Sequence, residues 1–163
     1  KGLKSYKIGH SKDTHRLVKE RKLILGGVDI PFELGLLGHS DADVLIHALC
    51  DALLGAAAMR DIGYHFPPIK GNEYENIDSK ILLRKVMQML RNAGYELGNC
   101  DCTICAEAPK LNPHIPTMIT CLAEVMGVNE NQISIKATTT EQLGFVGRKE
   151  GMAAQAVVLL TKK

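Results

Sequence analysis

The sequence predicts an α+β fold, a two-layer sandwich in which helices cover one face of a mixed sheet. Segments with the pattern of strands lie toward both ends of the chain, and segments with helical periodicity lie mostly between them. Their expected order is β-β-α-α-β-α-β-β. With 163 residues, 45% of them hydrophobic, the chain is long enough for one core, so we expect a single domain over residues 1–163.

Two short strands are expected near the start of the chain, at residues 6–10 and 23–28. Gly26 and Gly27 permit a bulge or a tight turn in the second strand. The charged segment 11–22 lies between the two strands.

The first helix is expected between residues 40 and 55. Three leucines recur there at four-residue spacing among good helix formers. Ser40 is a favourable N-cap, and Asp43 completes the Ser-x-x-acid form of a capping box. The helix is therefore expected to begin just after Ser40.

One face of this helix is expected to carry Asp43, His47 and Asp51, which follow one another at four-residue spacing. His39 precedes the helix, where free N–H groups and the helix dipole favour a bound anion. For His47 alone, the alternative is a histidine that is simply hydrogen-bonded within the core.

The charged segment supplies candidate metal ligands, Asp13 and His15. In an extended backbone, residues two apart face the same side, so these two side chains would act together. With His47 they give two imidazoles and one carboxylate, a set suited to Zn²⁺ with a fourth position open to substrate. An exposed turn is the alternative interpretation of the Asp-x-His sequence.

The middle of the chain is expected to contain a long loop, two helices and a strand. Residues 61–76 include two prolines, two glycines and two asparagines, which indicate a loop long enough to cover a substrate. Helices are expected at about 78–93 and 113–126, on either side of a strand at 96–106.

The chain has five cysteines, and this odd number argues for a reducing compartment rather than a disulfide framework. Cys100 and Cys102 would share one face of a strand while Cys105 faces the other way, so the three cannot converge on a metal. Buried free thiols are the favoured interpretation, also for Cys50 and Cys121.

A second polar cluster follows a strand expected at 132–137. The run Thr-Thr-Thr-Glu at 138–141 ends this strand, and Arg148 comes soon after. Hydroxyls, an acid and an arginine at a strand end can bind phosphate oxygens, a metal and a second anion. A polar turn after a β-branched strand end is the alternative. A last strand, at 152–161, completes the sheet.

Charge and hydropathy exclude several classes of protein. The net charge of +2, without a basic run, argues against nucleic acid as a partner. No apolar segment approaches the roughly 18–20 residues of a membrane span, and no secretory signal is recognisable. Because the chain begins with Lys1 rather than Met, we expect a segment to have preceded it.

Ordered motifs along the chain carry a resemblance to a known family. They are IGH at 8–10, DTH at 13–15, LLGHSDAD at 36–43, HALCDALLG at 47–55, DIG at 61–63, APK at 108–110, KATTTE at 136–141 and GRKEG at 147–151. Together they resemble the 2-C-methyl-D-erythritol 2,4-cyclodiphosphate synthases of the non-mevalonate isoprenoid pathway, over about residues 8–160.

The resemblance implies a ferredoxin-like subunit in a homotrimer, with active sites between neighbouring subunits. It implies a lyase that converts 4-diphosphocytidyl-2-C-methyl-D-erythritol 2-phosphate into the 2,4-cyclodiphosphate and CMP. The 2-phosphate of the substrate attacks the β-phosphorus. An isoprenoid diphosphate would be the ligand of the trimer pore, at Arg148.

The resemblance also implies residue roles. Asp13, His15 and His47 would bind Zn²⁺, and Glu141 would bind Mg²⁺ or Mn²⁺. His39 and Thr139 would be catalytic and stabilise the transition state. The substrate would be bound by residues distributed along the chain: Ser40, Asp51, Asp61, Gly63, Phe66, Ala106, Ala108, Pro109, Lys110, Leu111, Thr138, Thr140, Glu141, Phe145 and Arg148.

One departure from the family concerns Pro68, which stands where the family commonly has Asp, so one hydrogen bond to substrate is in question. Two other classes are alternatives: a non-catalytic ligand-binding trimer, and a zinc hydrolase with Asp51 as its base. The resemblance implies an apicoplast or chloroplast stroma if the source is eukaryotic, and otherwise a bacterial cytoplasm.

Overall fold

The computed structural model describes residues 4–162 and has a five-stranded sheet in the order β4-β1-β7-β5-β6. The strands are β1 (Ser5–Val18), β4 (Gly35–Leu36), β5 (Tyr95–Cys105), β6 (Ile133–Thr138) and β7 (Gly151–Lys162). β5 and β6 pair in parallel and the other neighbours are antiparallel, so the sheet is mixed. A separate hairpin consists of β2 (Leu23–Leu25) and β3 (Val28–Ile30).

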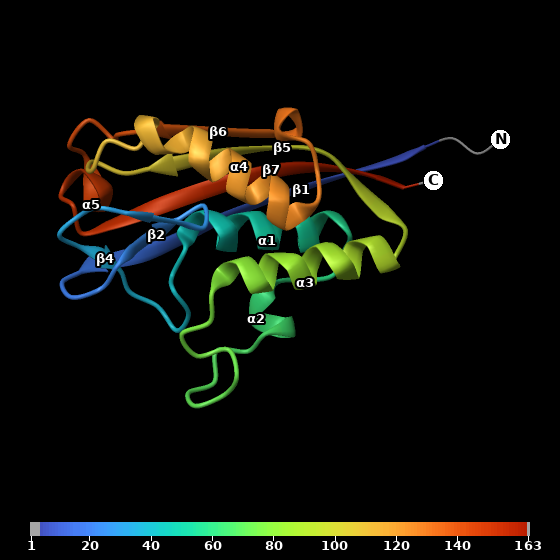
Figure 1. Ribbon diagram of the computed structural model, residues 1–163, viewed down its shortest axis with the longest axis horizontal. Coiled ribbons are helices and arrows are strands. Elements are labelled where there is room, and N and C mark those ends of the chain that lie inside the picture. Colours follow the sequence, from blue (N-terminus) through green and yellow to red (C-terminus); the bar gives the residue numbers. More distant parts are fainter. Residues whose placement is uncertain (1–3, 163) are drawn as a thin grey trace.

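Three long helices, α1 (Val44–Ala56), α3 (Ser79–Asn92) and α4 (Ile115–Met126), cover one face of the sheet (Figure 1). The connections contain the short helices α2 (Ile62–His65) and α5 (Gly144–Gly147) and the 3-10 turns η1 (Asn112–His114) and η2 (Glu130–Gln132). This arrangement confirms the predicted α+β sandwich with a mixed sheet. Within residues 4–162, no helix combines the length and the apolar character needed to cross a membrane.

The core forms around α1, of whose 13 residues only Asp51 and Gly55 are not buried. The helix packs against β1 at Gly9, where a Cβ atom would lie 1.8 Å from the carbonyl oxygen of Ala52. Only glycine permits this approach. The contact fixes α1 against the strand that carries Asp13.

The first strand is longer than predicted, because residues 11–18 continue β1. β7 pairs with β1 along nearly its whole length, so the backbone of this charged stretch is hydrogen-bonded while its side chains alternate in exposure. The strand predicted at 23–28 is instead the β2–β3 hairpin, with Gly26 and Gly27 at positive φ in its turn.

The predicted start of the first helix was wrong. α1 begins at Val44, and its N-cap is Asp43 rather than Ser40. The Asp43 carboxylate accepts hydrogen bonds from three backbone N–H groups, those of Ile46 (3.0 Å), Gly26 (3.0 Å) and Gly27 (2.7 Å). One buried carboxylate thus caps the helix and holds the hairpin turn, so it is not available to the site that His47 faces.

The remaining elements lie close to their predicted positions. The expected loop at 61–76 contains one helical turn, α2, and the rest of it is irregular. The five cysteines are free thiols; Cys50, Cys100 and Cys102 are buried as predicted, whereas Cys105 and Cys121 are only partly buried.

Candidate active site

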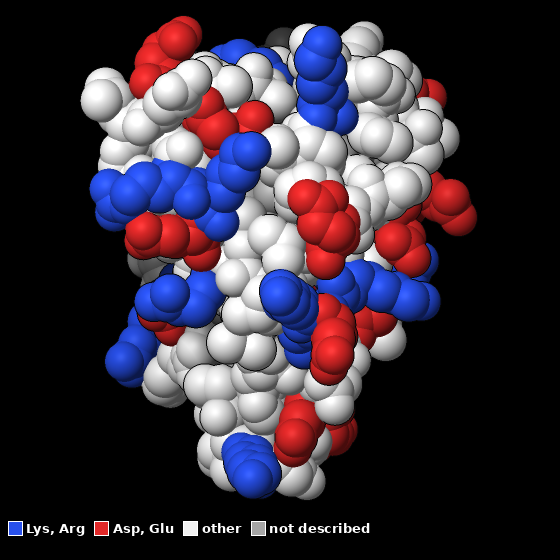
Figure 2. Space-filling model, turned by 90° about the vertical axis from the view of Figure 1, so that its left-hand side faces the viewer, with Lys and Arg blue, Asp and Glu red and all other residues white. Residues whose placement is uncertain are grey.

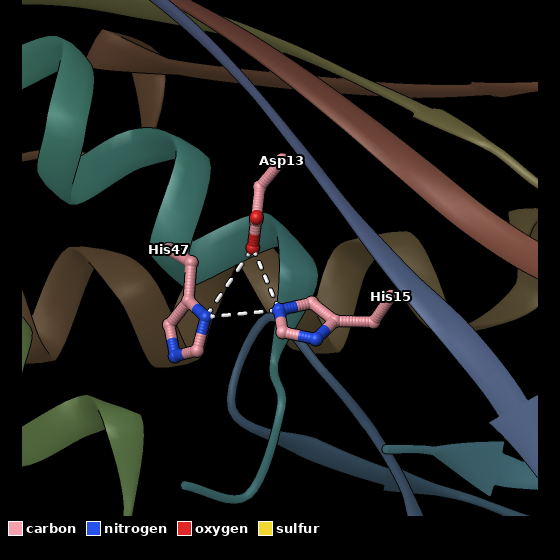
Figure 3. Close-up of side chains that lie close together, drawn as sticks. All are labelled: Asp13, His15 and His47. Atoms are coloured by element: carbon pink, nitrogen blue, oxygen red, sulfur yellow. Dashed lines mark hydrogen bonds and ion pairs between the residues drawn. The ribbon is translucent and has the colours of Figure 1, made fainter. Parts of the chain in front are cut away.

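Asp13, His15 and His47 come together where α1 packs on β1, with their ligand atoms within 4.8 Å of one another (Figure 3). His15 Nε2 lies 2.8 Å from Asp13 Oδ2 and 3.2 Å from His47 Nδ1. His47 Nδ1 lies 3.3 Å from the same carboxylate oxygen. The extended backbone of β1 points its two side chains to one side, as their spacing predicts.

The second nitrogen of His15 is fixed by the backbone. Nδ1 lies 2.8 Å from the carbonyl oxygen of Leu37, which can only accept, so Nδ1 donates and, in the neutral ring, Nε2 turns its lone pair toward the cluster. Gly38 leaves room for this ring, because a Cβ atom there would lie 3.1 Å from His15 Cε1.

The second nitrogen of His47 faces two hydroxyls. Nε2 lies 3.0 Å from Ser40 Oγ and 3.0 Å from Ser79 Oγ, so the buried ring presents Nδ1 to the cluster. Two imidazole nitrogens and one carboxylate oxygen, each ring with a second partner, form a donor set that fits a divalent metal ion.

The electrostatics of the cluster favour a positive charge between the three groups. Burial raises the pKa of Asp13, but the hydrogen bonds and charges of His15 and His47 outweigh it and hold that pKa well below its ordinary value. Burial lowers the pKa of His15, but its interactions with Asp13 and with the Leu37 carbonyl leave it raised. A proton and a metal ion compete for this position.

A cavity of about 270 Å³ opens beside the cluster. Of the predicted site residues, it is lined by His15, His39, Ser40, His47, Gly63 and Phe66. Pro68 also lines it. Two other predicted substrate ligands build the adjacent turn instead: Asp51 Oδ1 accepts from the N–H of Ile62 at 2.8 Å, and Asp61 Oδ1 accepts from that of Tyr64 at 2.9 Å.

The long loop contributes residues that the sequence analysis missed. Asn72 Oδ1 lies 3.3 Å from His39 Nε2, and its amide nitrogen donates to the carbonyl of Pro67 at 2.8 Å. Tyr74 packs edge-to-face on Phe66 at 5.5 Å between ring centroids. An Asn whose oxygen accepts from the N–H two residues on, here Tyr74 at 3.0 Å, is an Asx turn, and this signal was available in the sequence.

A second cavity, of about 400 Å³, lies at the carboxyl ends of β5 and β6. It is lined by Ala106, Pro109, Lys110, Leu111, Thr138 and Thr139 of the predicted set, and Ala108 lies in the same segment. Thr139 Oγ1 accepts from the N–H of Glu141 at 3.2 Å, and Thr140 Oγ1 donates to the carbonyl of Leu143 at 2.7 Å.

A third group of predicted residues lies around α5. Phe145 lines a hollow of about 240 Å³ together with His15 and Glu150. Arg148 donates from Nε to Glu150 Oε2 at 2.7 Å. Figure 2 shows basic and acidic side chains interspersed over the end of the molecule that carries α5 and β4.

The metal-cluster residues and the residues of the second cavity are thus two separate groups within one chain. The metal cluster lies on β1 and α1, and the second cavity lies on β5 and β6. In the sheet, β7 and β5 lie between β1 and β6. The structure does not bring Thr139 or Glu141 to the metal cluster of the same chain.

A family model described as the YgbB family matches residues 6–161. The chain is 67% identical over 156 residues to 2-C-methyl-D-erythritol 2,4-cyclodiphosphate synthase of Parabacteroides distasonis, with 96% of each chain covered. It is 55% identical over 159 residues to the synthase of Francisella philomiragia, with 97% of this chain and 99% of that protein covered. Both organisms are bacteria.

Two solved structures are similar to this chain over almost its whole length. The bifunctional IspDF of Campylobacter jejuni matches with a TM-score of 0.94 and 40% identity, over 99% of this chain and 43% of that one. The chain thus spans less than half of that bifunctional protein. IspF of Plasmodium falciparum, in a complex with CDP, matches with a TM-score of 0.86 and 33% identity over 99% of both chains.

Proposed function

The chain belongs to the YgbB family, and its relatives are 2-C-methyl-D-erythritol 2,4-cyclodiphosphate synthases. From this premise we propose the reaction that it catalyses. The chain is an enzyme. Its substrate would be 4-diphosphocytidyl-2-C-methyl-D-erythritol 2-phosphate. An oxygen of the 2-phosphate forms a bond to the β-phosphorus, and the bond from that phosphorus to the bridging oxygen breaks. CMP leaves with the electron pair, and the 2,4-cyclodiphosphate remains.

The observation that carries this proposal is the convergence of Asp13, His15 and His47 beside the cavity lined by His39. We assign Zn²⁺ to these three residues and Mg²⁺ or Mn²⁺ to Glu141. When bound, such cations neutralise phosphate charge and orient phosphate oxygens, which matters because both reacting groups are anions.

The side chains of the protein would then position the substrate and stabilise the transition state. The substrate supplies its own nucleophile, so catalysis needs the 2-phosphate held in line with the β-phosphorus. Thr139 has a hydroxyl oxygen that accepts from Glu141 N–H, which leaves its own O–H free to donate to a phosphate oxygen. His39, at the cavity wall, would stabilise the same charge as it develops.

The second cavity would hold the cytidine. Support comes from its largely apolar lining by the segment 106–111 and Thr138, and from the CDP in solved structures of similar proteins. Lys110 is exposed at its rim, where a cation would pair with a phosphate.

A homotrimer would join the two groups of residues. Three inter-strand spacings of ~4.8 Å separate β1 from β6 by about 14 Å, so one chain alone leaves the site divided. The sheet face that the helices do not cover exposes Ile8 (73%), Tyr6 (62%) and Val157 (45%), an apolar surface suited to neighbouring subunits. An isoprenoid diphosphate would be the ligand of the central pore, at Arg148. The chain would form a single domain over residues 1–163, and we place it in a bacterial cytoplasm, as the two synthases compared above are bacterial.

The proposal is tested by incubating the purified chain with the cytidyl substrate and following the products by ³¹P NMR. After treatment with a chelator, the chain should be inactive, and added Zn²⁺ with Mg²⁺ should restore equal amounts of CMP and cyclic diphosphate. Release of a linear phosphate product would instead indicate a hydrolase. Binding of the substrate without turnover would indicate a non-catalytic binding protein.

A further inference from the structure

We propose that Ser79, held by Asp41, is a positioning residue that fixes the tautomer of His47 and thereby prepares Nδ1 of that ring for a divalent metal ion. This inference rests on the proposed metal site but not on the proposed reaction. It assigns a role to two residues outside the three metal ligands, on segments far apart in the sequence.

Ser79 is the first residue of α3 and is fully buried. Its hydroxyl lies 2.5 Å from Asp41 Oδ1, and its backbone N–H donates to Asp41 Oδ2 at 3.0 Å. Asp41 Oδ1 also accepts from the N–H of Asp43 at 3.1 Å. The same hydroxyl oxygen lies 3.0 Å from His47 Nε2. The carboxylate therefore anchors the start of α3 against the segment that leads into α1.

The direction of each hydrogen bond in the series Asp41–Ser79–His47 follows from the Asp41 carboxylate. An ionised carboxylate only accepts, so the Ser79 proton goes to Asp41. The Ser79 oxygen then faces His47 with its lone pairs, so Nε2 must carry the ring proton. In the neutral ring Nδ1 is consequently unprotonated, and it is Nδ1 that faces Asp13 and His15.

Ser40 does not fix the tautomer of His47, although its hydroxyl is equally close to Nε2 of that ring. Its oxygen accepts from the N–H of Ala42 at 3.1 Å, but among the described residues 4–162 its proton has no acceptor other than His47 Nε2. Ser40 can therefore either accept from Nε2 or donate to it. Ser79 can only accept, because Asp41 takes its proton.

Without Ser79 the metal-free ring would be free to adopt the opposite tautomer. Ser40 would donate to Nε2, and Nδ1–H would donate to the Asp13 carboxylate, which is 3.3 Å away. A metal ion would then have to displace this proton before it could bind. Loss of an outer partner of a metal-binding histidine typically lowers metal affinity 10–100-fold.

The test compares Ser79→Ala with Ser40→Ala, a matched control at the same nitrogen. Long-range ¹H–¹⁵N spectra of the metal-free proteins report the tautomer of His47, and calorimetric titration with Zn²⁺ alone reports affinity. We expect Ser79→Ala to move His47 toward the Nδ1–H form and to weaken Zn²⁺ binding by about 10–100-fold. Ser40→Ala should keep the Nε2–H form and nearly full affinity.

An unchanged tautomer and affinity in Ser79→Ala would overturn the proposal, as would equal losses in both variants. If circular dichroism shows that Ser79→Ala does not fold, Asp41→Asn examines the same contact. Asparagine has one acceptor oxygen where the carboxylate accepts three hydrogen bonds, so the Ser79 proton is no longer fixed and a shift of His47 toward the Nδ1–H form is expected. Failure of the unsubstituted protein to bind Zn²⁺ would count against the proposed metal site itself. The tautomer of His47 in the metal-free proteins would still test the role of Ser79.

Discussion

His39 Nε2 lies 3.3 Å from Asn72 Oδ1, and this contact joins the long loop between α2 and α3 to the wall of the candidate active site. The amide of Asn72 cannot be reversed, because its nitrogen donates to the carbonyl of Pro67 and its oxygen accepts from the N–H of Tyr74. His39 must therefore donate from Nε2, which orients its ring.

Replacing Asn72 with Ala should release this loop and the ring of His39 together. The hydrogen bond that orients His39 contributes about 1 kcal/mol, so its loss should lower kcat/KM for the cytidyl substrate roughly fivefold. Faster amide exchange is expected over residues 66–77. The control is Lys70→Ala, an exposed position in the same loop. Unaltered kinetics in Asn72→Ala would show that the contact does not orient a group needed for the reaction.

Replacing His47 with Ala should remove most of the bound divalent metal and the activity that depends on it. The change removes one hydrogen-bond partner each from Ser40 and Ser79, which costs about 1–3 kcal/mol of unfolding free energy, so the chain should still fold. Elemental analysis of the purified variant measures the metal. His114→Ala, a histidine with no side-chain cap contact at the start of α4, is the control. Stoichiometric zinc in the His47 variant would refute the assigned ligand set.

The cluster was accessible from the sequence because its geometry is largely local. The two-residue period of a strand places Asp13 and His15 on one side, and His47 stands on a helix that the leucine spacing reveals. The N-cap at Asp43 was not accessible, because two of its three N–H partners belong to a hairpin turn distant in sequence. The contact of Ser79 with His47 spans 32 residues and depends on how α3 packs on α1, which no local pattern encodes.

Replacing Ile8 with Glu should prevent assembly if the uncovered sheet face is the subunit interface. Ile8 is 73% exposed in one chain, and a charge buried there without a partner would cost roughly 3–5 kcal/mol in the assembly. Light scattering should then report a monomer without activity. Ile69→Glu, which changes an exposed residue of the long loop, should remain a trimer. A fully active monomer of the unsubstituted protein would contradict both the interface and the shared site.

Stability should depend on pH through Asp51. Burial raises the pKa of this carboxyl, and the nearby Asp61 adds to the effect, although the hydrogen bond from Ile62 opposes it. A raised folded-state pKa means that the stability contributed by the group is complete below its unfolded pKa of about 4 and is lost as pH rises through the folded value.

Asp51→Asn, which stays neutral, should therefore gain stability relative to the unsubstituted protein between pH 4 and pH 7. Thermal unfolding of both metal-free proteins across this range measures the difference. Asp29→Asn, which removes a carboxylate at an exposed position, is the control. A difference in stability between Asp51→Asn and the unsubstituted protein that narrows toward neutral pH would contradict the raised pKa of Asp51.

Thr139 separates catalysis from binding in the proposed reaction. Its hydroxyl oxygen accepts from Glu141 N–H, which leaves the hydroxyl proton free for a phosphate oxygen. If that contact strengthens in the transition state, Thr139→Val should lower kcat and kcat/KM together, by about 10²–10³, as does removal of an oxyanion donor. Valine keeps the β-branched shape, so the fold should hold.

Thr138→Val is the matched comparison, because the neighbouring hydroxyl donates to the Thr139 carbonyl at 3.0 Å and so has no free proton to offer. Thr138 lines the cavity assigned to the cytidine, so its loss should raise KM and leave kcat nearly unchanged. Steady-state kinetics on the two purified variants distinguish these outcomes. A raised KM with unchanged kcat in Thr139→Val would make Thr139 a binding residue, and His39 would remain as the candidate stabiliser of the transition state.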